Sequence, residues 1–327
     1  MKEMTIRDAV NLALTREMEQ DPAVFIMGED IGIYGGAFGV TKGMLDQFGP
    51  QRILETPISE ASLMGIATGC ALSGMKPILE IMFMDFTTLI TDQILNHAVK
   101  LKYMFGGKEE IKIPVVVRAP FGGGRAYGAS HSQSLEGLFM HMPGIKIVAP
   151  STPQDAYTLL RKSIQDPNPV LFLEHKLLYS KQGAVDENNM ETEIGKAKLT
   201  RTGNDVSIFA YGRMHDFALE AASKLSGEGY EAEVTDLITI SPMDKESIRR
   251  SAAKTGRVVI VEEGTVTGGV GAEISAVVME NSFFSLEAPP VRVASPDIPI
   301  PYSPTLENAA LPDVGRIVRA AMETLKY

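Results

Sequence analysis

The stretch "ASLMGIATGCALSGMKPILEIMF" (residues 61–83) decides the fold. Residues 61–74 are almost all small or apolar and predict a helix, and residues 76–83 continue as an apolar run without polar alternation. A strand that is apolar at every position is covered on both faces, as strands of a parallel sheet are. Similar runs recur along the first half of the chain: "AVFIMG" (23–28), "IPVVVRAP" (113–120), "IKIVAP" (145–150) and "PVLFLEH" (169–175).

Helical segments separate these strands, at 5–19, 86–104 and 152–165. This alternation predicts an α/β fold in which helices flank a mostly parallel sheet. A chain of this length favours two domains. Residues 186–204 lose the pattern and gain charge, so we predict a linker there, between an N-terminal domain at 1–185 and a smaller α/β domain at 205–327.

Composition excludes several classes of function. The chain has 327 residues, with 31 basic against 41 acidic side chains and a net charge of −10, which argues against binding nucleic acid or an anionic membrane. The single cysteine, Cys70, rules out a disulfide framework and reads as a small buried hydrophobe rather than a nucleophile. The sequence begins without a signal-peptide pattern and has no apolar run of about 20 residues. We therefore expect a soluble, cytoplasmic protein.

Two segments imitate known motifs. "GGGRAYGASHS" (122–132) resembles an esterase loop, but Ser132 replaces the second glycine of the nucleophile elbow and the glycines lie beside the serine. "GTVTGGVGAE" (264–273) follows a strand and opens a helix without matching G-x-G-x-x-G, so an ordinary turn is the better interpretation. No histidine pair has metal-binding spacing. His131 lies in a glycine-rich loop with serine neighbours, where a functional role and a bland one are both open.

Glu60 stands alone at the start of the helix predicted at 61–74, with no second acid beside it that would form a catalytic pair. A carboxylate there favours the N-terminal helix dipole, and by itself that is the simpler explanation. The helix predicted at 86–104 is apolar on two sides, since Leu95, Val99 and Met104 lie outside the stripe of Phe86, Leu89, Ile90, Ile94 and Leu101. It is either enclosed in its own fold or buried against another subunit.

Three long segments carry a family resemblance: "LETPISEASLMGIATGCALSGMKPILEIMFMDF", "GASHSQSLEGLFMHMPGIKIVAPSTPQDAYTLL" and "DPNPVLFLEHKLLY". They resemble the β subunit of the thiamine-diphosphate-dependent decarboxylating component of 2-oxoacid dehydrogenase complexes, in the transketolase-like superfamily. Pyruvate, branched-chain 2-oxoacid and acetoin dehydrogenases belong to this group. The resemblance runs from residue 4 to the C-terminus and includes "PDIPIPYSPTLE". "EIMFMDF", "KYMFGG" and "FLEHKLLY" look most like acetoin dehydrogenase subunits.

The resemblance assigns roles to individual residues. It implies a thiamine-diphosphate pyrimidine-type domain followed by a transketolase C-terminal-type domain. Glu60 would bond a pyrimidine nitrogen of thiamine diphosphate, and the substrate would be cleaved through a thiazolium adduct. A carboxyl group in an apolar setting can share a proton with such a nitrogen near neutral pH. Ile58, Met82 and Phe86 would contact the pyrimidine ring, although by composition they are equally core residues. His131 would help to pass the acyl group to a lipoyl arm.

The resemblance also implies a potassium site. Its ligands would be oxygens of Val115, Ser163, Ile164, Asp166 and Asn168, mostly backbone carbonyls. "QDPNP" (165–169) is also simply a good turn. The chain departs from the family pattern at Arg125 and Tyr127, whose bulk would alter the entrance of the site.

One motif of this enzyme class is absent. The sequence contains no G-D-G, the motif with which thiamine-diphosphate enzymes hold Mg²⁺ and the diphosphate. The resemblance places that half in an α subunit and implies an α2β2 heterotetramer, acting on a 2-oxoacid or acetoin and serving a lipoyl-bearing acyltransferase core. Its C-terminal domain would help to dimerise β and to dock that core. A self-contained transketolase-type enzyme would need G-D-G in this chain. A non-catalytic scaffold would need neither Glu60 nor His131.

Overall fold

The apolar runs of the first half form a parallel sheet, in a computed structural model that describes residues 1–106 and 111–327. The strands run in the order β6-β7-β5-β4-β2-β3 and pair in parallel throughout. Almost every residue of the five predicted strands is buried, which confirms that both faces of the sheet are covered. Their bounds are β2 Val24–Gly28, β3 Ile53–Glu55, β4 Lys76–Glu80, β5 Val116–Phe121, β6 Lys146–Val148 and β7 Val170–His175.

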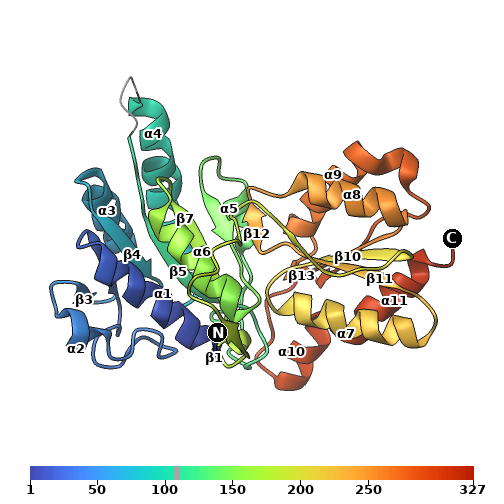
Figure 1. Cartoon of the computed structure of the whole chain (residues 1–327), viewed down its shortest axis with the longest axis horizontal. Coiled ribbons are helices and arrows are strands. Elements are labelled where there is room, and N and C mark those ends of the chain that lie inside the picture. The colour runs from blue at the N-terminus through green and yellow to red at the C-terminus, as the bar shows by residue number, and fades with distance from the viewer. Residues whose placement is uncertain (107–110) are drawn as a thin grey trace. The chain divides into compact units, whose positions relative to one another are not determined.

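Helices cover this sheet on both faces (Figure 1). Helix α1 (Ile6–Gln20) and helix α6 (Pro153–Gln165) pack side by side on one face, and α3 (Glu60–Leu72) packs with the helical stretch 84–105 on the other. The side chains of Thr5 and Thr152 cap α1 and α6, which explains where these helices begin. Within the described ranges, no helix is both long and apolar enough to cross a membrane.

The stretch predicted as one helix at 86–104 is helical but irregular. It consists of a 3₁₀ segment η1 (Met84–Ile90), a π segment η2 (Gln93–Ala98) and the short helix α4 (Val99–Phe105). Ile90 and Ile94 are buried, whereas Tyr103 is 90% exposed and Leu89, Met104 and Phe105 are also exposed. The stretch thus packs within its own unit on one side and leaves apolar side chains uncovered on the other.

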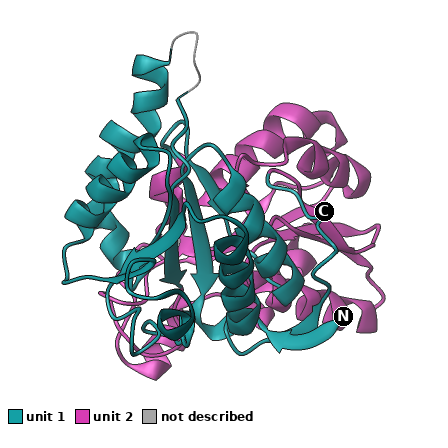
Figure 2. Cartoon of the chain, turned by 60° about the vertical axis from the view of Figure 1, so that its left-hand side comes forward, with its two compact units in different colours: residues 1–121, 141–194 teal, residues 122–140, 195–327 magenta. Residues whose placement is uncertain are grey.

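The remaining elements belong partly to a second compact unit. Residues 1–121 and 141–194 form the first unit, and residues 122–140 and 195–327 form the second (Figure 2). The sequence did not indicate that 122–140 would group with the later part of the chain. The first unit also holds α2 (Met44–Phe48), the 3₁₀ segment η3 (Lys176–Leu178) and the antiparallel pair β1 (Lys2–Thr5) and β8 (Gln182–Val185). The linker expected at 186–204 stays a prediction.

The second unit is a smaller α/β layer built on its own sheet, in the order β14-β13-β10-β11-β9. Four strands are parallel and the edge strand β9 is antiparallel. Helices α7 and α11 pack on one face, and α8 and α9 on the other (Figure 1). The bounds are α5 Glu136–Met140, β9 Lys198–Arg201, β10 Val206–Ala210, α7 Arg213–Gly227, β11 Ala232–Asp236, β12 Thr239–Ser241, α8 Lys245–Thr255, β13 Val258–Thr265, α9 Val270–Ser282, η4 Phe283–Ser285, β14 Val291–Ser295, α10 Pro304–Ala310 and α11 Val314–Thr324.

Candidate active site

Three neighbouring strands of the first unit end at one edge of its sheet. Gly28 of β2 lies in register with Glu55 of β3 and Glu80 of β4. The backbone N–H of Thr56 donates to the Gly28 carbonyl at 3.0 Å, so the chain leaving β3 stays beside the end of β2. Ligands of parallel α/β sheets bind at the carboxyl ends of the strands. The segments that follow these strands therefore form the candidate site.

Glu60 lies at this edge as the first residue of α3. Its side chain is only 7% exposed, and the N-cap residue Ser59 makes no side-chain capping bond. Within residues 1–106 and 111–327, no group donates a hydrogen bond to the Glu60 carboxylate. With no donor from the described residues, these oxygens are left to the little solvent that reaches them or to a ligand. The position suits the helix dipole, but the unmet acceptors also suit a ligand.

A second carboxylate, Glu29, lies beside Glu60 and was missed from the sequence. Glu29 directly follows β2, is 7% exposed and accepts a hydrogen bond from the Ser59 backbone N–H at 3.3 Å. Burial raises the pKa of Glu29, and the negative charge of Glu60 raises it further. The signal that could have found it is its place directly after an apolar strand. The edge therefore holds two interacting acids, where the sequence showed one.

The predicted apolar contacts gather at the same edge. Ile58 precedes α3 and is 77% exposed, which is unusual for isoleucine. Met82 and Phe86 follow β4 and are half-buried. The Phe86 ring packs edge-on against Phe83, with ring centroids 6.1 Å apart. The first unit thus brings Ile58, Glu60, Met82 and Phe86 to one end of its sheet, and their contact with a pyrimidine ring stays a prediction.

His131 lies in the second unit, in the loop that precedes α5. The Ser130 hydroxyl lies 2.8 Å from His131 Nδ1. Strand β5 ends at Phe121 and α5 begins only at Glu136, so no sharp strand-to-helix turn presents a serine here. Ser132 is buried. The resemblance to an esterase therefore has no structural counterpart.

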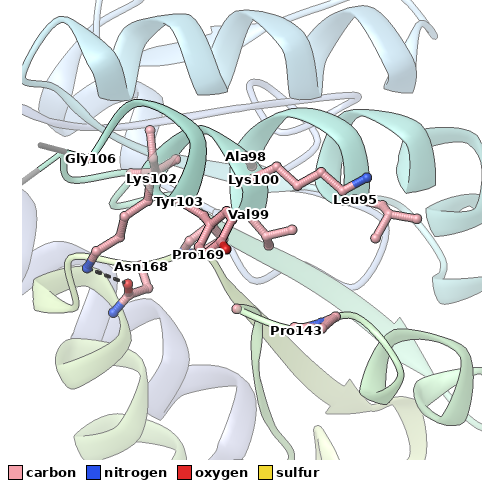
Figure 3. Close-up of a pocket in the computed structure, with 12 residues that line it drawn as sticks. Leu95, Ala98, Val99, Lys100, Lys102, Tyr103, Gly106, Pro143, Asn168 and Pro169 are labelled. Atoms are coloured by element: carbon pink, nitrogen blue, oxygen red, sulfur yellow. Dashed lines mark hydrogen bonds between the residues drawn. The ribbon is translucent and has the colours of Figure 1, made fainter.

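Four of the five residues predicted to hold potassium lie at the end of α6 or just after it, and Val115 is joined to the chain that follows them. The Val115 carbonyl accepts from the Val170 N–H at 2.9 Å, and the Ser163 carbonyl accepts from the Asp166 N–H at 3.3 Å. Lysines bond the two side chains, Lys146 to Asp166 and Lys102 to Asn168, the latter at 3.0 Å (Figure 3). Each carbonyl keeps a second lone pair, and those of Ser163 and Ile164 lie at the negative end of α6, so these oxygens suit a monovalent cation. Its use for potassium stays a prediction.

A cavity of about 820 Å³ runs along α4 (Figure 3). Its walls are mainly apolar, and the Lys102–Asn168 hydrogen bond crosses one side. Of the residues predicted for the site, Asn168 lines it and Ile58, Glu60, Met82 and Phe86 do not. The cavity is therefore separate from the strand edge that carries Glu60. No cluster of three or more metal-ligating side chains occurs in the part of the chain that the structure describes.

The segment "GTVTGGVGAE" proves to be an internally capped turn. Glu262 of β13 is buried and accepts the Gly271 N–H at 2.9 Å, at the start of α9. Burial raises the pKa of Glu262 to about 7. A dinucleotide phosphate would need these same N–H groups at the helix N-terminus. The carboxylate already occupies that place, which agrees with the expectation of an ordinary turn.

Comparisons with known proteins cover both units. Residues 2–182 match the family model "Transketolase, pyrimidine binding domain", and residues 195–317 match "Transketolase, C-terminal domain". A solved structure described as a split gene transketolase, inactive β4 tetramer, superposes with a TM-score of 0.80 at 25% identity and covers 99% of both chains. The fold predicted from the sequence is thereby confirmed.

Several named relatives align over nearly the whole chain. The mitochondrial pyruvate dehydrogenase E1 component subunit β-1 of Arabidopsis thaliana is 46% identical, over 98% of this chain and 89% of that protein. The 2-oxoisovalerate dehydrogenase subunit β of Bacillus subtilis is 42% identical over the full length of both. The acetoin:2,6-dichlorophenolindophenol oxidoreductase subunit β of Cupriavidus necator is 44% identical, over 99% of this chain and 98% of that protein.

Proposed function

Because this chain belongs to the family of β subunits of 2-oxoacid and acetoin dehydrogenase E1 components, we propose that it supplies the pyrimidine-binding half of a thiamine-diphosphate site. The observation that carries this proposal is the nearly buried Glu60 carboxylate, to which no described residue donates a hydrogen bond. A pyrimidine ring nitrogen that shares a proton with the carboxylate would satisfy it.

The neighbouring residues suit the same ligand. Thiamine diphosphate, when bound, supplies the carbon nucleophile and the electron sink for cleaving a bond next to a carbonyl. Glu60 would hold a proton on the ring, and Glu29 next to it, whose pKa burial and the charge of Glu60 raise, would form a second proton-holding group beside the ring. Ile58, whose side chain is uncovered, and the half-buried Met82 and Phe86 would enclose the ring. Apolar enclosure excludes water and strengthens the bond to the carboxylate.

The diphosphate and Mg²⁺ would be held by a second polypeptide. The chain lacks G-D-G, and its relatives are named as subunits. We assign this role to an α subunit in an α2β2 particle. A structural potassium ion would bind at the carbonyls of Val115, Ser163 and Ile164 together with Asp166 and Asn168. This assignment rests on their oxygen-only chemistry and on the helix end beside them.

The substrate would be a 2-oxoacid or acetoin, and His131 would serve acyl transfer to a lipoyl arm of an acyltransferase core. The relatives are named for pyruvate, 2-oxoisovalerate and acetoin chemistry at 46%, 42% and 44% identity, values too close to choose among them. Their compartments also differ, since the Arabidopsis name is mitochondrial and the Bacillus name carries no organelle. We keep the cytoplasm as the proposed location.

Two other functions can be distinguished from the proposed one. A self-contained transketolase-type enzyme would have to hold the diphosphate within this chain, and the sequence offers no G-D-G for it. A non-catalytic scaffold would have no use for a nearly buried carboxylate with unmet acceptors. If the chain were a non-catalytic scaffold, loss of the Glu60 carboxylate would leave turnover of the complex unchanged.

The test is Glu60→Gln in the assembled complex. The amide keeps the shape of the side chain but does not share a proton with the ring in the same way. We expect the complex to assemble and to keep its cofactor, as calorimetry would measure. Decarboxylation should fall about a hundredfold or more. Glu193→Gln, an exposed site in the same unit, is the matched control. Normal turnover of the Glu60 variant at full occupancy would contradict the assignment.

A further inference from the structure

The loop that carries His131 has an unusual backbone before the histidine. Gly122, Gly124, Ala126 and Gly128 adopt positive φ angles of 90°, 89°, 56° and 71°. Ala126 is one of the few non-glycine residues in the described structure with a positive φ, a conformation that costs energy for any residue with a Cβ. A backbone in which positive φ angles recur at every second residue can turn several N–H groups towards one point and form a nest for an anion.

Two buried carboxylates of the same unit fill this nest. Glu307 of α10 is 2% exposed and accepts the Gly124 N–H at 2.9 Å with one oxygen and the Ala126 N–H at 2.8 Å with the other. Glu263, at the end of β13, accepts the Gly123 N–H. Hydrogen bonds to an ionised acceptor are roughly twice as strong as neutral ones. Because one carboxylate bonds two N–H groups, it fixes the direction of the loop as well as its distance from α10.

Close packing reinforces the same contact at two points. A Cβ on Gly123 would lie 2.9 Å from Leu311 Cδ1 and 3.2 Å from Glu307 Oε1. A Cβ on Gly128 would lie 2.8 Å from Tyr302 Cδ2. The loop therefore lies directly against the segment 302–311 at both ends of the nest. A side chain at Gly123 would push Leu311 aside, and one at Gly128 would also have to adopt a positive φ.

A short path leads from this contact to the histidine. The His131 backbone N–H donates to the Gly128 carbonyl at 3.3 Å, which closes a turn onto the last anchored residue. The Ser130 hydroxyl then lies 2.8 Å from His131 Nδ1. A change in the direction of the backbone at Gly124 or Ala126 is thus transmitted through Gly128 to the imidazole.

We propose that Glu307, assisted by Glu263, is a positioning residue that holds the loop so that the His131 imidazole stays in its working place. The inference rests on the acyl-transfer role proposed for His131. Glu307 bonds the loop backbone with both oxygens and need not touch substrate or cofactor. A purely stabilising role would affect every reaction of the complex alike, whereas positioning acts selectively on the step that uses His131.

The test is Glu307→Gln in the assembled α2β2 complex. The amide presents one oxygen and one NH2 group, so one of the two loop N–H groups loses its acceptor and faces a donor instead. A misplacement of about 1 Å costs about a hundredfold in rate. We expect acylation of a lipoyl domain to fall by about 10- to 100-fold, while decarboxylation with an artificial electron acceptor changes by less than about twofold. Glu323→Gln, an exposed glutamate on α11, should change neither rate.

A double variant and hydrogen exchange complete the test. If Glu307 acts through His131, Glu307→Gln combined with His131→Ala should be no slower in acylation than His131→Ala alone. Amide exchange at 123–126 should accelerate in Glu307→Gln, which reports the contact independently of activity. Unchanged exchange at these amides, or equal losses in both assays, would overturn the inference. Normal acylation by His131→Ala would instead refute the role proposed for His131, while the exchange result still decides whether Glu307 holds the loop.

Discussion

Buried carboxylates in this chain differ in what satisfies their oxygens. Both oxygens of Glu307 accept backbone N–H groups, whereas Glu136 accepts the Tyr211 hydroxyl at 2.6 Å with one oxygen and has no described partner at the other. Burial, as the largest cause, raises the pKa of Glu136 from 4.5 to about 7. An acid that is partly protonated at neutral pH links the stability of the second unit to pH.

The direction of this linkage follows from proton binding. Because the folded-state pKa of Glu136 lies above its unfolded value, the folded chain binds more protons between about pH 4.5 and 7, and its contribution to stability falls as pH rises through that window. Glu136→Gln keeps an oxygen for Tyr211 and removes the titration. The variant should therefore gain stability over the native chain between pH 5 and pH 8, by about 1–3 kcal/mol.

Urea unfolding of both proteins at pH 5 and pH 8 measures this difference directly. Carboxyls remote from Glu136 titrate alike in the two proteins, so the change with pH in the stability difference reports Glu136 together with its coupled neighbours Glu262 and Glu263. Glu280→Gln, at an exposed position on α9, is the control and should show no pH-dependent gain. A Glu136 variant whose stability difference stays constant from pH 5 to pH 8 would show that Glu136 remains ionised in the fold.

The sequence identifies single residues only where a local pattern marks them. Glu60 stands at a predicted helix boundary within a family motif, and the structure places it at the end of the strands. Glu136 and Glu307 could not be found in this way. Their partners are remote, with 75 positions between Glu136 and Tyr211 and 183 between Gly124 and Glu307. Such pairs depend on the tertiary fold, which no local pattern of residues encodes.

At the level of elements, hydrophobic patterns predict that a helix or strand is present better than they predict its type. Apolar runs located β2, β4, β5, β6 and β7, since complete burial leaves a signal in every residue. The sequence at 86–104 has the apolar stripe of an α-helix, yet the stretch 84–105 combines 3₁₀, π and α turns. The stretch packs against α3, a tertiary contact that a periodicity does not contain. Short elements such as β3 and α2 were missed because three to five residues carry too little pattern.

Glycines at helix starts give a prediction at this scale. A Cβ on Gly271 would lie 2.6 Å from Glu262 Oε1 and 3.2 Å from Ile260 Cγ2, so Gly271→Ala must push the capping carboxylate away from α9. We expect a loss of about 1–3 kcal/mol, the usual cost of overpacking a buried site. Gly227→Ala, in α7 with nothing within 4 Å of the new Cβ, is the matched control.

Gly227→Ala should leave the stability of the chain unchanged or raise it slightly, because alanine forms helices more readily than glycine. Thermal unfolding of the two variants beside the native chain measures both effects. Equal midpoints for Gly271→Ala and Gly227→Ala would mean that Glu262 does not need the space at the start of α9.

For the whole molecule, the proposed function implies a site with one half present. The first unit offers Glu60, Glu29 and three apolar residues at its strand edge, and the chain contains no G-D-G for the diphosphate and Mg²⁺. The chain also leaves Leu89, Tyr103, Met104 and Phe105 exposed along one helical stretch. Exposed apolar side chains in such number are typical of a surface that another subunit covers.

The chain alone should therefore self-associate, bind thiamine diphosphate weakly and catalyse nothing. Adding the α subunit should give an α2β2 particle with tight, Mg²⁺-dependent cofactor binding and turnover of a 2-oxoacid or acetoin, because the diphosphate ligands then complete the site. Calorimetric titration of the cofactor into the chain alone, then into the mixture with and without Mg²⁺, separates the two states. The mixture without Mg²⁺ is the control for diphosphate anchoring. Tight, Mg²⁺-dependent binding and turnover by the isolated chain would show that it holds a complete site and works as a self-contained enzyme of the transketolase type.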